Sequence, residues 1–148
     1  MSDWQIRPFL AVGPVAFGST RGSVRQQLNE EPRVVVKNPG ERPMEQYPSA
    51  GLQAHYDKLD RLELVEFYPN ASVKFDGVEL LGRDLDDVRH DLATRGLSPR
   101  DDGLGDIVYD SHGFGLYIEG DAIASVSVFS REYANRESGA GEPNSVAP

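Results

Sequence analysis

The fold is decided by Gly13-Pro-Val-Ala-Phe-Gly18-Ser-Thr-Arg-Gly-Ser-Val24-Arg25-Gln-Gln-Leu28, which recurs 64 residues later as Gly77-Val-Glu-Leu-Leu-Gly82-Arg-Asp-Leu-Asp-Asp-Val88-Arg89-His-Asp-Leu92. Two glycines, a Val-Arg pair and a leucine are identical at this fixed offset, without gaps. The same order and spacing of apolar and turn-forming residues recur in both stretches. We therefore predict that the chain contains one structural unit twice.

Each copy predicts a glycine turn followed by a short helix. Thr20 and Asp84 stand where an N-cap side chain would accept a hydrogen bond from the first helical turn. Pro32 prevents the first helix from continuing, and Gly96 suits the C-terminal end of the second. Apolar residues at helical spacing lie between these limits: Val24 and Leu28 in the first copy, then Leu85, Val88 and Leu92 in the second.

Alternating and β-branched segments follow each helix and predict strands. They are residues 33–37, 52–56 and 61–68 after the first helix, and residues 106–110, 114–118 and 122–129 after the second. Turn residues at 58–60 and 119–121 separate the last two segments of each set, which predicts antiparallel hairpins. The expected unit is a short helix followed by about three antiparallel strands.

These elements predict an α+β fold in which two tandem repeats form one sheet-rich domain over residues 1–133. Repeat one covers about residues 13–68 and repeat two about residues 77–129. A proline-rich stretch at 38–49 is expected to be a loop inserted in the first repeat. Residues 134–148 are rich in Gly, Ser, Asn, Glu and Pro, which predicts a disordered tail.

Composition restricts the functions that need to be considered. The chain has 148 residues and a net charge of −9, so nucleic acid is a poor partner, because binding its phosphates requires Lys and Arg. A basic protein fits this charge better. There are no cysteines, which excludes disulfides and thiolate metal sites. No apolar run is long enough to cross a bilayer and no secretory signal is visible, so we expect a cytoplasmic protein that does not contact membrane.

No pattern of catalytic or cofactor-binding residues emerges. The histidines, His55, His90 and His112, lack the paired spacing of a zinc site. The run Asp101-Asp-Gly-Leu-Gly-Asp106 lacks the ligand order and closing glutamate of a calcium loop. The glycines fit no phosphate-binding motif, and no serine lies in a nucleophile elbow. We therefore predict a protein that is not an enzyme and that holds no metal or cofactor.

The repeated Gly-x-x-x-x-x-Val-x-x-x-Leu, with Glu31-Pro32 after its first copy, resembles the helical motif of two related groups. These are the tandem-repeat β-lactamase-inhibitor proteins and the outer-membrane assembly lipoproteins. The resemblance covers residues 13–129 in pattern. It implies a concave antiparallel sheet that presents a protein-binding surface. Those proteins are exported, whereas this chain shows neither an export signal nor a lipid-bearing cysteine, so a β-lactamase target does not follow.

Two functions remain open. The first is a non-catalytic protein-binding module, such as a cytoplasmic immunity or inhibitor protein for a basic partner. The second is a small-ligand-binding protein or an enzyme, with a pocket between the two repeats. The oligomeric state is open as well. Six side chains on or beside the expected strands are the candidate partner-binding residues: Tyr47, His55, Asp57, Tyr109, Tyr117 and Glu119.

Overall fold

The computed structural model describes residues 3–101, 103 and 105–137 of the chain. Within these residues the helices are α1 (Arg21–Leu28), α2 (Leu85–Ala93), the 3₁₀ turn η1 (Asp110–His112) and α3 (Arg131–Glu137). The strands are β1 (Asp3–Arg7), β2 (Ala11–Val12), β3 (Val15–Ala16), β4 (Arg33–Val35), β5 (Met44–Tyr47), β6 (Leu52–Tyr56), β7 (Leu62–Phe67), β8 (Ser72–Phe75), β9 (Val78–Glu79), β10 (Arg100–Asp101), β11 (Asp106–Tyr109), β12 (Phe114–Glu119) and β13 (Ala122–Phe129).

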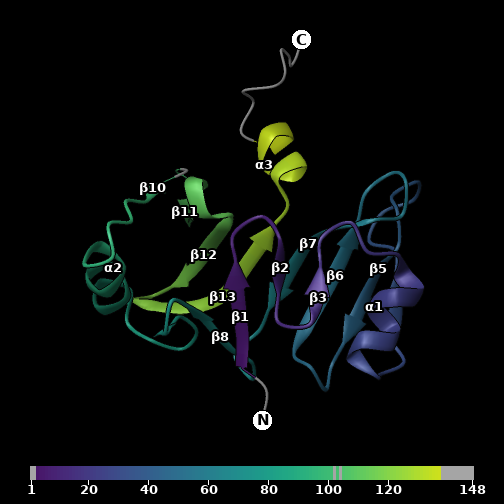
Figure 1. The fold of residues 1–148 in the computed structure, drawn as a ribbon, viewed down its shortest axis with the longest axis horizontal. Helices are drawn as coiled ribbons and strands as arrows, with labels where there is room; N and C mark the ends of the chain where they lie inside the picture. Colours follow the sequence, from purple (N-terminus) through teal and green to yellow (C-terminus); the bar gives the residue numbers. More distant parts are fainter. Residues whose placement is uncertain (1–2, 102, 104, 138–148) are drawn as a thin grey trace.

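The strands form two sheets. The larger sheet has eight antiparallel strands in the order β10-β11-β12-β13-β7-β6-β5-β4. The smaller has five strands in the order β3-β2-β1-β8-β9, and its central pair, β1 with β8, is parallel. Figure 1 shows α1 and α2 at opposite ends of the molecule, with the strands of the smaller sheet between them. The chain is thus an α+β, sheet-rich protein, as expected.

The two sequence stretches occupy corresponding places, because each contains an edge strand of the smaller sheet, β3 or β9, and the helix that follows it, α1 or α2. We call residues 13–68 the first half and residues 77–129 the second half. In each, a helix precedes four antiparallel strands, and the last strands, β7 and β13, pair at the centre of the sheet. The Gly18 amide donates to the Leu62 carbonyl, and the Gly82 amide donates to the Ile123 carbonyl. Each glycine turn therefore attaches to the last strand of its own half by the same main-chain bond.

Both helices begin where the sequence predicts. The hydroxyl of Thr20 accepts a hydrogen bond from the Ser23 amide, and the carboxylate of Asp84 accepts one from the Asp86 amide. The first helix ends at Asn29, which adopts a left-handed backbone conformation. The predicted hairpins, β6–β7 and β12–β13, are also present. The pairing register shifts between His55 and Tyr56 in the first hairpin and between Tyr117 and Ile118 in the second.

One face of the larger sheet carries the core. Cross-strand neighbours such as Leu52–Phe67 and Phe114–Val128 lie on this face, and their side chains are buried. Val24 of α1 and Val88 of α2 pack into the same cluster, as does Trp4 of the smaller sheet. Helices α1 and α2 and the smaller sheet therefore cover one face of the larger sheet, and we call the opposite face the open face.

The structure corrects the expectation for the proline-rich stretch. Residues 44–47 form strand β5, so the loop between β4 and β5 spans only residues 36–43. Each helix is consequently followed by four strands, rather than about three. Strand order also changes the correspondence between the halves, because β4 and β10 are the two edges and β11 occupies the position of β5. The sequence had matched residues 33–37 to residues 106–110 instead.

The two ends of the chain also differ from expectation. Residues 134–137 belong to α3, and the rest of the expected tail lies outside the described residues. The smaller sheet was not anticipated, because its parallel pair joins segments about 70 residues apart. Gly13 forms part of the turn between β2 and β3 of this sheet; its φ is +56°, and a Cβ there would lie 2.6 Å from the Trp4 ring. Only glycine suits such a close approach in this conformation.

Candidate functional site: the open face and its acidic end

The six predicted partner-binding residues do not lie together. Tyr47 and Tyr109 are fully buried, with exposed fractions of 0% and 1%, so neither ring is available to a partner. This corrects their selection as surface anchors. They belong to the core because each lies on the helix-facing side of its strand, opposite Leu52 and Phe114 respectively.

The other four residues are accessible to different degrees. Tyr117 is 43% exposed on the open face, and His55 is half-buried on the same face. Asp57 closes its own turn by accepting hydrogen bonds from the Leu59 and Arg61 amides. Glu119 is exposed at the end of β12. Tyr117 and Glu119 are two residues apart on one strand, so both project from the open face.

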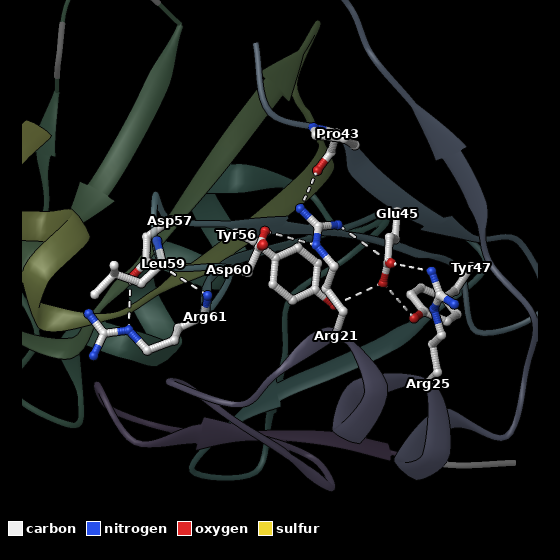
Figure 2. A network of polar contacts seen from close by, with 10 residues as sticks. All are labelled: Arg21, Arg25, Pro43, Glu45, Tyr47, Tyr56, Asp57, Leu59, Asp60 and Arg61. Carbon is white, nitrogen blue, oxygen red and sulfur yellow. Dashed lines mark hydrogen bonds and ion pairs between the residues drawn. The ribbon is translucent and has the colours of Figure 1, made fainter.

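A buried carboxylate that the sequence did not single out holds α1 against the sheet (Figure 2). Glu45 has an exposed fraction of 0%, and its Oε1 accepts hydrogen bonds from the hydroxyls of Tyr47 and Tyr56 at 2.9 and 3.0 Å. Its Oε2 accepts a hydrogen bond of 2.8 Å from Nη2 of Arg25, and Nη1 of Arg21 lies 3.5 Å away. We call these five residues the Glu45 cluster.

The cluster keeps its carboxylate ionised. Burial alone would raise the pKa of Glu45, but the hydrogen bonds from Arg25 and the two tyrosines outweigh burial and lower it. Burial and the neighbouring carboxylate raise the pKa values of Tyr47 and Tyr56. Arg21 also stacks over the Tyr56 ring, 4.2 Å from its centroid. Both oxygens of the buried carboxylate are bonded within the cluster, so the cluster stabilises the fold.

In the second half, an apolar residue, Ile107, occupies the strand position that corresponds to Glu45. Strand pairing places Ile107 opposite Leu116, as Glu45 is placed opposite Ala54. Tyr109 corresponds in the same way to Tyr47, but its buried hydroxyl has no hydrogen-bond partner among the residues that the structure describes. A comparison of the halves would have drawn attention to Glu45, because it stands where the other half has an apolar residue.

A row of hydrogen-bonded polar side chains crosses the open face of the first half. Gln46 donates to Gln53 at 2.9 Å, and Gln53 donates to Oε1 of Glu66 at 2.9 Å. The Nε2 of His55 lies 2.7 Å from the same Oε1. The hydrogen bond from His55 lowers the pKa of Glu66 below its usual range, against the opposing effect of burial. Glu66 therefore carries a fixed negative charge near the middle of the open face.

A hollow of about 580 Å³ lies beside this row. Its walls are the 36–43 loop and Tyr133 of α3, and its floor includes His55, Leu64 and Glu66. In the second half, the small residues Gly115 and Ser127 occupy the strand positions that match Gln53 and Glu66. The proline-rich loop and His55, two features that distinguish the halves in sequence, thus come together at one place.

Five exposed carboxylates gather at the far end of the second half. The α2 N-terminus and the β12–β13 turn are joined there, because the Leu85 amide donates to the Asp121 carbonyl. None of the five forms an ion pair within the part of the chain that the structure describes. We call them the acidic patch: Asp84, Asp86, Asp87, Glu119 and Asp121.

The matching region of the first half is neutralised. Asp57 pairs with Arg61 at 3.3 Å, and Asp60 pairs with Arg21 at 3.0 Å. The residues that stand in place of these arginines in the second half are Leu85 and Ala122. The acidic patch is therefore specific to one half, and it lies next to the exposed ring of Tyr117.

Other kinds of site find no support in the described residues. These residues contain no group of three or more His, Asp or Glu side chains placed to hold a metal ion. Nor does any helix among them have the length and apolarity needed to cross a membrane. Comparisons with protein-family models, curated proteins and solved structures found no match for this chain. The function must therefore be argued from the site alone.

Proposed function

We propose that this chain is a non-catalytic protein-binding module that binds a basic protein partner through its open face and acidic patch. The observation that carries this proposal is the set of five exposed carboxylates without cation partners beside the exposed Tyr117. Three of the five, Asp84, Asp86 and Asp87, also complement the dipole of the α2 N-terminus, whereas Asp57 and Asp60 of the first half are each paired with an arginine. The unpaired patch is instead complementary to Lys and Arg on another molecule.

The charge of the whole chain acts in the same direction. A net charge of −9 attracts a basic protein over distances of about 10 Å or less at physiological salt. Such attraction mainly raises the rate of association and excludes acidic competitors. The affinity then has to come from a desolvated contact, and Tyr117 is suited to provide one, because tyrosine combines a large apolar ring with a hydroxyl.

The duplicated architecture belongs to the same proposal. Two copies of one unit, each a helix followed by four strands, would form one continuous sheet. The surface residues of each copy could then change independently of the other copy. The repeated main-chain bonds at Gly18 and Gly82 support this interpretation. A small acidic binding module that lacks cysteines suits a cytoplasmic immunity or inhibitor protein, which acts by covering its target. A ligand pocket between the halves has less support, since the 580 Å³ hollow lies over the first half.

Affinity capture with matched variants tests the proposal. Wild-type protein, a Glu119→Lys/Asp121→Lys variant and a control Glu31→Lys/Glu132→Lys variant would be immobilised in equal amounts and exposed to lysate of the native cell. All four positions are exposed, and the two variants change the net charge equally. A basic protein recovered in stoichiometric yield by the wild type and the control, but lost with the patch variant, is the expected result. Equal recovery by both variants would exclude the acidic patch as the binding site.

A further inference from the structure

The hollow over the first half has the chemistry of a pocket for one basic side chain. Its floor contains Leu64, which is 8% exposed, and Met44, which is 5% exposed, so both offer apolar surface at the bottom of a recess. The Tyr133 ring lines one wall. Apolar and aromatic walls suit the methylene stem of arginine or lysine, which leaves only the charged head to be matched.

Glu66 is placed to match that head. Both of its hydrogen-bond partners, Gln53 and His55, contact Oε1. No hydrogen bond or ion pair to Oε2 is found among the described residues, and the side chain retains an exposed fraction of 29%. The carboxylate is therefore oriented by its neighbours while one oxygen remains available from the hollow. A carboxylate that is held in place loses little side-chain freedom when it pairs with a cation.

We propose that this hollow is the anchor pocket for a single arginine or lysine side chain of the partner, with Oε2 of Glu66 accepting hydrogen bonds from its cationic head. This inference rests on the proposed function, because it assumes a basic protein partner. It adds a second contact on the same open face, separate from the acidic patch. The patch attracts the partner, and the pocket fixes its orientation by selecting one side chain.

Charged side chains of both signs line the hollow around Glu66. Lys37 lies close enough to contribute to the electrostatic environment of Glu66, and Arg42 also lines the hollow. Neither forms an ion pair with Glu66 in the described residues. Two further carboxylates line the hollow: Glu41, and Glu63, which pairs with Arg136 at 2.7 Å. Removal of Lys37 is expected to strengthen binding, whereas neutralisation of Glu66 is expected to weaken it.

The test uses a small probe in place of the partner. The ¹⁵N-labelled full chain would be titrated with N-acetyl-arginine amide and, as a neutral isostere, N-acetyl-citrulline amide, with amide chemical shifts recorded by NMR. We expect arginine-dependent shifts at residues 53, 55 and 66, and none with citrulline. Glu66→Gln, which keeps the hydrogen-bond acceptor at Oε1, should weaken binding about tenfold, the usual scale for loss of a charge-assisted bond. Lys37→Ala should strengthen it, and Glu31→Gln, at an exposed position outside both the hollow and the acidic patch, should leave it unchanged.

Three results would overturn the anchor pocket: equal binding of citrulline, unchanged binding by Glu66→Gln, or shifts confined to the acidic patch. The spectrum of each variant reports directly whether it has folded. These results leave the proposed function standing if the captured partner still binds the wild type and not the patch variant. The two proposals therefore fail separately.

Discussion

Replacing Tyr47 by phenylalanine removes one hydroxyl from the Glu45 cluster and leaves the ring in place. That hydroxyl donates to Oε1 of Glu45 over 2.9 Å, and both side chains have exposed fractions of 0%. A buried hydrogen bond to a charged group contributes about 1.5–3 kcal/mol, so Tyr47→Phe should lower the free energy of unfolding by that amount. Tyr56 and Arg25 remain on the carboxylate, which should prevent a larger loss.

The second half provides a matched control. Tyr109 occupies the equivalent strand position, but its buried hydroxyl has no hydrogen-bond partner within the described part of the chain. Because an unsatisfied buried hydroxyl costs about 1–3 kcal/mol, Tyr109→Phe should leave stability unchanged or raise it.

Urea denaturation at pH 7, followed by the fluorescence of Trp4, would give the change in unfolding free energy for both variants. The comparison requires that the unfolding free energy depends on urea concentration with the same slope in each protein. Equal destabilisation by the two variants would refute the assignment of an orphan hydroxyl to Tyr109. It would also remove the energetic contrast between the halves.

Further predictions concern pH and backbone conformation. The folded-state pKa of Glu45 is depressed, so its contribution to folding stability is complete above its ordinary pKa of 4.5 and is lost as the pH falls through the folded-state pKa. Glu45→Gln should therefore be less stable than the wild type at pH 7. In acid titrations followed by circular dichroism, the same variant should lose less stability than the wild type. The raised pKa values of Tyr47 and Tyr56 give stability the opposite pH dependence. The free energy of unfolding should decline above pH 10.0, the ordinary tyrosine pKa, and it should decline less steeply in Tyr56→Phe. Gly13→Ala should lower the melting temperature more than Gly77→Ala, because both glycines have positive φ but only Gly13 lies against a ring; equal shifts in calorimetry would contradict the close approach to Trp4.

Local signals allowed much of the fold to be predicted from the sequence. Thr20 and Asp84 mark the helix starts because an N-cap acts on the next turn, within three residues. The two hairpins follow from short turns between alternating segments. Strand β5 was missed because prolines flank it on both sides, and its pairing with β6 depends on tertiary context. The parallel pairing of β1 with β8 has no local signal at all.

The candidate site was predictable only in part. Tyr117 could be placed on an open face because strand side chains alternate, whereas Glu119, expected in the turn, is the last residue of β12. The same rule did not show that Tyr47 and Tyr109 are buried, because it does not tell which face of a strand a helix will cover. Glu66 drew no attention because its neighbours, Gln53 and His55, meet it only across paired strands. The acidic patch likewise depends on the β12–β13 turn meeting the α2 N-terminus.

We propose that the open face and the acidic patch bind a basic protein. Carboxyl-directed chemical labelling of the complex with the captured partner, read by mass spectrometry, tests it most directly. Binding should protect Glu119, Asp121 and Glu66 from labelling and leave Glu31, which lies just after the helix covering the opposite face, unchanged. Protection of Glu31 with unaltered labelling of Glu119 and Asp121 would contradict the account.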